Sequence, residues 1–65
     1  MPLFVFNNFD YQLNAKVNLD VKKIFGKNSK INVKDLETGK KLFSNVNNFT
    51  ISVSQRNFRL LEVSL

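Results

Sequence analysis

Residues 11–19 read YQLNAKVNL, and this stretch decides the fold class. Its apolar side chains, those of Tyr11, Leu13, Ala15, Val17 and Leu19, alternate with polar ones at every intervening position. A period of two residues places each set on one face of a β-strand, whereas a helix needs apolar residues three and four positions apart. We therefore expect a strand over residues 11–19 with an apolar inner face and a solvated outer face.

The same alternation recurs in two later segments, residues 30–34 and residues 49–54. Between them, Thr38-Gly39 suits a hairpin loop, because glycine accepts the left-handed conformation without steric cost. Residues 41–44 are then the strand that returns from this loop. Together with the N-terminal and C-terminal segments, these elements predict an all-β fold, a small antiparallel β-sandwich of about six strands.

Two segments depart from simple alternation. Residues 20–25 have helical spacing after Asp20, a good N-cap, and predict one helical turn or irregular chain. In the last segment Phe58 and Leu60 occupy even-numbered positions, which lie on one face of a strand. Leu61 and the apolar residues after it occupy odd-numbered positions, which lie on the other face. We expect either a bulge near Leu60 and Leu61 or burial on both faces of that strand.

The residues Leu3, Phe4, Val5 and Phe6 are apolar without interruption, as in a strand that is covered on both faces. The partner sheet can cover one face, but the other needs a loop, a second copy or a neighbouring domain. These four residues are therefore the candidate docking surface, with a larger polypeptide or a homodimer as the partner. The alternative is that the strand crosses the end of the sandwich and buries both faces internally.

The length of 65 residues leaves room for a single domain over residues 1–65. The chain has neither cysteine nor histidine, so the commonest general base, the thiolates and the commonest zinc ligand are missing. Asp35 and Glu37 flank the hairpin and suit turn capping, with nearby lysines lowering their pKa values. We expect no enzyme activity, no catalytic residue, no cofactor and no metal site.

The longest apolar run covers only residues 3–6, far short of the roughly 18 residues that a membrane span needs, so we expect no membrane partner.

Ten basic and five acidic residues give a formal charge of +5, which raises the alternative of a small basic β-barrel that binds nucleic acid. Such binders need aromatic rings on the same face as the basic groups. The alternation places Tyr11 and Phe49 on the same face as the apolar residues, so we expect the rings inside and the lysines outside. Phe9 is the ring that we expect to be most open to solvent.

Three later stretches resemble a known family: VKDLETGK at 33–40, FTISV at 49–53 and FRLLEV at 58–63. They are similar to the C-terminal β-sandwich of glycoside hydrolases of the α-galactosidase and α-amylase type. In that domain a strand ends in an Asp-Leu-aromatic-Thr-Gly-Lys hairpin, and an Arg-Leu-Leu strand closes the chain. LFVFNN at 3–8 is similar to the family strand that runs into an asparagine-containing turn.

The resemblance implies a noncatalytic accessory domain that packs against the catalytic domain of a carbohydrate-active enzyme. The matching hairpin positions, Asp35, Leu36, Thr38, Gly39 and Lys40, are structural in that family, so no catalytic residue carries over. Glu37 stands where the family often has tryptophan. The family strand that precedes the one matching Leu3 to Phe6 is absent, which implies a strand without a neighbour on one side.

Overall fold

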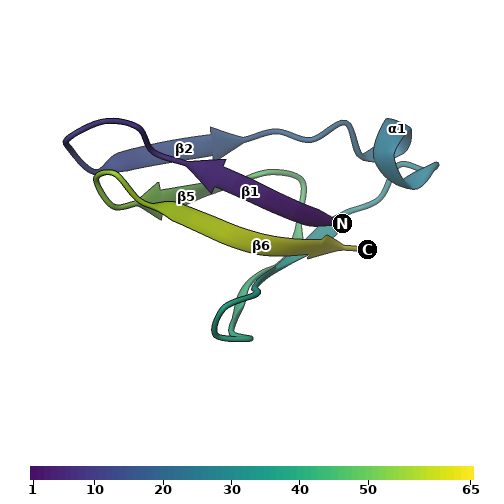
Figure 1. The fold of residues 1–65 in the computed structure, drawn as a ribbon. Coiled ribbons are helices and arrows are strands. Elements are labelled where there is room, and N and C mark those ends of the chain that lie inside the picture. Colours follow the sequence, from purple (N-terminus) through teal and green to yellow (C-terminus); the bar gives the residue numbers. More distant parts are fainter.

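The computed structural model describes all residues from 1 to 65. Strands and the helix follow one another as β1 (Pro2–Phe6), β2 (Leu13–Val17), α1 (Val21–Phe25), β3 (Ile31–Asp35), β4 (Lys41–Val46), β5 (Phe49–Val53) and β6 (Phe58–Ser64). All strand pairs are antiparallel. The predicted all-β fold of about six strands is confirmed (Figure 1).

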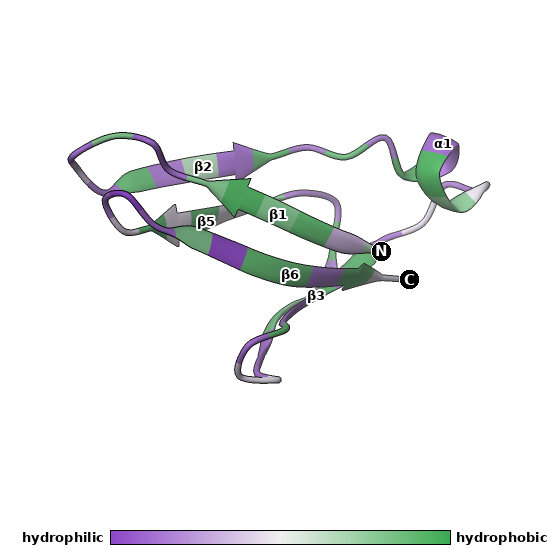
Figure 2. Cartoon of the chain, viewed as in Figure 1, coloured by the Kyte–Doolittle hydropathy of each residue, from purple (hydrophilic) through white to green (hydrophobic).

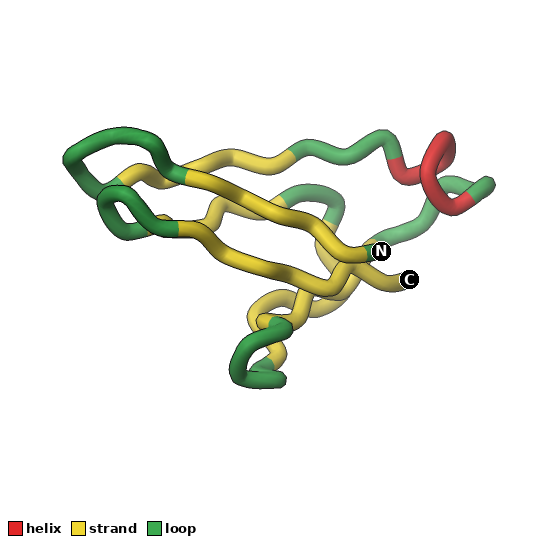
Figure 3. The backbone as a smooth tube through the Cα atoms, in the orientation of Figure 1, coloured by secondary structure: helices red, strands yellow, loops and turns green.

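The strands form two sheets. One has four strands in the order β1-β6-β3-β4, and the other pairs β2 with β5. Figure 1 shows β1 lying along β6, while the hairpin between β3 and β4 projects away from the other strands. The tube in Figure 3 shows the same path: the β1–β2 and β5–β6 loops lie at one end of the strands, and the loop of the β3–β4 hairpin lies apart from them. β1 is an edge strand with β6 as its single neighbour.

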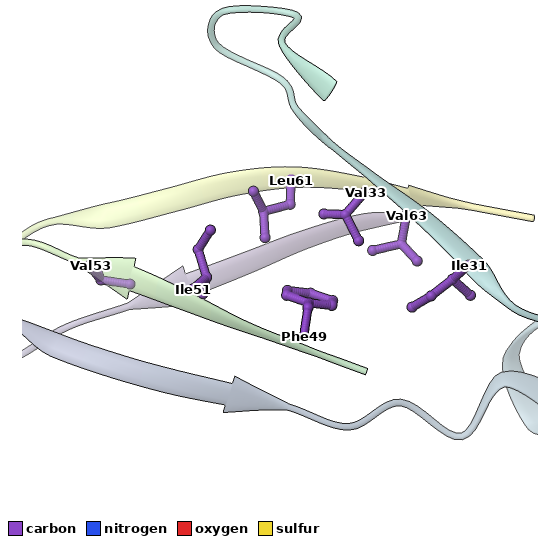
Figure 4. Packing of buried hydrophobic residues seen from close by; sticks show 7 residues of the cluster. All are labelled: Ile31, Val33, Phe49, Ile51, Val53, Leu61 and Val63. Carbon is purple, nitrogen blue, oxygen red and sulfur yellow. The ribbon is translucent and has the colours of Figure 1, made fainter. Parts of the chain in front are cut away.

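The core lies between the two sheets (Figure 4). The four-stranded sheet contributes Ile31, Val33, Leu61 and Val63, and the two-stranded sheet contributes Phe49, Ile51 and Val53. Each set alternates along its strand with residues that face outward, because successive side chains of a strand point to opposite sides. The predicted inner faces of residues 30–34 and 49–54 are therefore confirmed.

The local predictions at the hairpin and the helix are also confirmed. Gly39 has φ of 76° in the β3–β4 hairpin, and its N–H donates to the Asp35 carbonyl at 2.7 Å. Helix α1 is a single short helix whose N-cap is Asp20, and Asp20 Oδ1 accepts from the Lys23 N–H at 3.1 Å. Gly26, with φ of 84°, ends this helix.

One boundary prediction is wrong, and one of the two alternatives for β6 is excluded. The strand expected from residue 11 begins at Leu13, because the Tyr11 carbonyl is held at 2.8 Å by the side chain of Asn7 and stays in the loop. No bulge interrupts β6 at Leu60 and Leu61, since its pairings with β1 and β3 keep one register throughout. The register shifts lie between β3 and β4, where Asn45 has a left-handed φ of 58°.

Candidate docking surface

The apolar run from Leu3 to Phe6 is divided between two environments. Leu3 and Val5 are half-buried and pack against the core. Phe4 and Phe6 point outward, and 59% and 55% of their surfaces are exposed. Figure 2 shows β1 as hydrophobic along most of its length. The alternative in which this strand buries both faces internally is therefore wrong, and more than half of the surface of both rings on the outer face of β1 is open to solvent.

The exposed side of β1 continues onto β6. Phe4 lies opposite Leu60, and Phe6 lies opposite Phe58. The ring of Phe4 stacks on that of Phe58, with centroids 5.0 Å apart and planes inclined by 20°, and lies 6.2 Å from that of Phe6. Phe58 is 40% exposed and Leu60 is half-buried. We call these four residues, Phe4, Phe6, Phe58 and Leu60, the aromatic face.

Sequence reasoning missed half of the aromatic face, although its signal was present. Phe58 and Leu60 have the opposite parity to Leu61 and Val63, which are fully buried. From the sequence, this pattern predicts either a bulge or burial on both faces of the strand. In the structure the inward side of β6 does not change, and the odd parity instead marks a second, outward-facing apolar pair beside Phe4 and Phe6.

A polar row borders the aromatic face. The register runs across the four-stranded sheet from Pro2 to Glu62, then to Lys34 and then to Lys41. The Met1 amino group donates to Glu62 Oε1 at 2.9 Å. The row therefore carries both signs of charge, and its two lysines are on β3 and β4 rather than between the rings. An apolar centre with a polar rim is typical of surfaces that bind other proteins.

A second exposed aromatic pair lies in the loop between β1 and β2. The rings of Phe9 and Tyr11 stack with centroids 5.1 Å apart and planes inclined by 18°. The Phe9 N–H donates to Asn7 Oδ1 at 2.9 Å, and the Phe9 carbonyl accepts from the Arg56 N–H at 3.0 Å. The Arg56 side chain reaches Asp10 at 2.7 Å. Hydrogen bonds between the two neighbouring loops thus fix the backbone that carries this pair.

The expectation that the rings form the interior is wrong for most of them. Phe49 alone among the aromatic residues is buried, and Phe25 and Phe43 are half-buried. The exposed rings are those of Phe4, Phe6, Phe9, Tyr11 and Phe58. Phe9 is exposed as expected, whereas the interior position expected for Tyr11 is contradicted by its exposed fraction of 58%. The core consists mainly of aliphatic side chains.

The charged groups divide into paired arginines and unpaired lysines. Arg56 pairs with Asp10, and Arg59 pairs with Asp35 at 3.2 Å. All eight lysines are exposed, and none has a carboxylate within salt-bridge distance. The expected solvated, lysine-rich exterior is confirmed.

Asp35 acts as the expected turn cap. Its Oδ1 accepts from the backbone N–H groups of Glu37 at 2.8 Å and of Thr38 at 3.2 Å. The bond from Glu37 is the main reason that the pKa of Asp35 lies below its usual value; Thr38 and Arg59 lower it further, and partial burial opposes them. The direction of the shift agrees with the sequence prediction, but its causes are backbone donors and Arg59 rather than the neighbouring lysines.

Comparisons of the chain with protein families, with curated proteins and with solved structures find no match. No helix in the structure has the length and the apolar character that crossing a bilayer requires.

Proposed function

We propose that the chain is a noncatalytic binding module that docks on a larger protein through the aromatic face. The observation that carries this proposal is the stack of Phe4, Phe6 and Phe58, three rings held open to solvent on the outside of a regular sheet. Burying a fully exposed side chain of this kind contributes about 1.5–3 kcal/mol. These rings are 40% to 59% exposed, so covering them yields roughly half of that value for each ring. Aromatic residues clustered at the centre of a surface are the usual main contributors to protein interfaces.

The finer proposal is that the larger protein is a carbohydrate-active enzyme, with this chain as its accessory β-sandwich packed against the catalytic domain. It is supported by the resemblance of residues 33–40, 49–53 and 58–63 to the C-terminal domain of glycoside hydrolases. The open side of β1 agrees with this role, because such a domain uses its apolar surface for packing.

Nucleic-acid binding is the second candidate. It is favoured by the exposed rings together with eight lysines that have no acidic partner. Two features place it second. Phe4 and Phe58 stack on each other, which removes one face of each ring from contact with a base. The two lysines on the other strands of this sheet, Lys34 and Lys41, lie in the row that contains Glu62.

A photo-crosslinking experiment in the source cells tests the proposal. A benzoylphenylalanine is introduced in place of Phe58 in one variant and in place of Ile24, an exposed apolar residue on α1, in the matched control. We expect the Phe58 variant to crosslink to one defined protein and the Ile24 variant not to. Mass spectrometry then identifies the partner, and a glycoside hydrolase catalytic domain supports the finer proposal.

Two outcomes of this experiment count against docking. Crosslinks to nucleic acid at position 58 support the second candidate instead. Equal and diffuse crosslinking at positions 58 and 24 shows that the aromatic face has no preferred protein partner, and removes the proposal.

A further inference from the structure

The free backbone edge of β1 is separate from the aromatic face. β1 pairs with β6 on one side and with no strand on the other, and β2, which follows it in sequence, belongs to the other sheet. β1 carries no charged side chain, whereas β4, the opposite edge of the same sheet, begins with Lys41. Charged residues, bulges and proline are the usual protection of a sheet edge against pairing with another chain, and β1 has only Pro2, at its first position.

The hydrogen bonds at both ends of β1 show which of its backbone groups face the free edge. The Val63 N–H donates to the Met1 carbonyl at 2.9 Å, and the Asn7 N–H donates to the Asn57 carbonyl at 2.9 Å. In an antiparallel ladder, bonded residues alternate with unbonded ones, so Leu3 and Val5 direct their N–H and C=O groups toward β6. Phe4 and Phe6 therefore direct theirs to the free edge, where Pro2 adds a carbonyl.

We propose that β1 pairs antiparallel with β1 of a second copy across a two-fold axis, so that two four-stranded sheets become one continuous sheet. With Phe4 opposite Phe4 of the second copy, these residues exchange N–H···O bonds in both directions. Phe6 then lies opposite Pro2 of the second copy and donates to its carbonyl, again in both directions. Every outward N–H of β1 finds an acceptor in this register, and the proline that has no N–H lies at the end of the ladder.

The side chains on β1 are compatible with the same register. On the inner side, Leu3 lies opposite Val5 of the second copy, so the two half-buried residues extend the core of each molecule. On the outer side, the two Phe4 rings become cross-strand neighbours, an arrangement that stabilises antiparallel pairs. The chain carries a formal charge of +5 and repels its copies over much of its surface, but no two like charges meet along this edge.

Edge pairing leaves the aromatic face open, because strands that pair side by side keep both faces of the sheet free. The inference therefore goes beyond the proposed docking function and does not depend on it. In the paired form the aromatic faces of two copies lie next to each other on one side of the continuous sheet.

Sedimentation velocity from micromolar to millimolar concentration tests the pairing. We expect a reversible monomer–dimer equilibrium that added sodium chloride strengthens, because salt screens the repulsion between two basic chains. By hydrogen exchange, the amides of Phe4 and Phe6 are expected to exchange freely at low concentration and to become protected at high concentration. A chain that stays monomeric over the whole range, or a dimer in which both amides remain unprotected, overturns the proposal.

Phe4→Pro and Phe4→Ala form a matched pair of variants. Both remove the ring, but only the proline removes the N–H that points to the second copy, and neither changes the bonds between β1 and β6. We expect dimerisation to be weakened at least about tenfold more by proline than by alanine. Equal weakening contradicts edge pairing, and a Phe4→Pro chain that does not fold leaves the exchange of the two amides in the unmodified protein as the deciding measurement.

Discussion

Asn7 is the one fully buried polar residue, and it ties the loop after β1 to the end of β5. Its Nδ2 group donates to three backbone carbonyls, at 2.8 to 3.1 Å, and its Oδ1 accepts from the Phe9 N–H. We expect Asn7→Ala to lower the free energy of unfolding by about 2–4 kcal/mol, because the buried carbonyl of Val53 loses its side-chain donor. Urea unfolding measures the change, and Asn8→Ala, at an exposed neighbouring site, should cost no more than about 0.5 kcal/mol.

Asp35 makes the stability depend on pH on the acid side. Its pKa in the folded chain lies below the usual value, chiefly because the Glu37 N–H donates to its carboxylate. A carboxyl group whose pKa is lower in the folded than in the unfolded chain stabilises the fold while it is ionised. This contribution is complete at pH values above the unfolded pKa of about 3.9 and is lost as the pH falls through the folded pKa. We expect Asp35→Asn to flatten the loss of stability below that pH in thermal unfolding, with Glu37→Gln as the charge-matched control. An unchanged acid-side slope in Asp35→Asn contradicts this assignment.

The hairpin between β3 and β4 depends on the left-handed backbone of Gly39. A Cβ atom built there meets no atom within 4 Å, so a substitution has a backbone cost and no steric clash. We expect Gly39→Ala to cost about 1–2 kcal/mol, and Gly39→Asn to cost less because asparagine tolerates this conformation better. In a domain of this size each kcal/mol lowers the melting temperature by about 4–8 °C. Equal melting temperatures for the two variants would contradict the assignment of the cost to the left-handed backbone at this position.

At the level of strands, alternation predicted β3 and β5 well because each has one buried face. Alternation failed where it had to show which of the two faces of a strand is turned toward the core. Parity shows that Phe58 and Leu60 share a face, but not that the core is on the other side of β6, which pairing with β1 and β3 decides. The start of β2 differs from the prediction because the side chain of Asn7 donates to the Tyr11 carbonyl, and the alternation of apolar and polar residues carries no sign of such a bond.

For the whole molecule, size explains why most of the rings are outside. A 65-residue chain encloses a small interior. Seven mainly aliphatic residues already fill it, of which five are on β3 and β5 and two are on β6. The prediction that Leu3 to Phe6 lacked a cover rested on an unbroken apolar run, which the small interior cannot bury on both sides. The second half of the aromatic face, Phe58 and Leu60, depends on the pairing of β6 with β1, which the sequence did not reveal.

The distribution of charge over the whole molecule predicts weak, nonspecific binding of single-stranded DNA. The eight exposed lysines lie on β2, β3 and β4, on α1 and in the loops, rather than among the rings of the aromatic face. We expect labelled oligothymidine to bind only at low salt, with Lys22→Gln/Lys23→Gln weakening binding and Phe58→Ser changing the Kd less than about twofold. A base stacked on Phe58 would instead make that substitution cost about 1–3 kcal/mol, roughly 5-fold to 150-fold in Kd. Fluorescence anisotropy at several salt concentrations separates the two, and a large loss with Phe58→Ser would move the aromatic face from protein docking to nucleic-acid recognition.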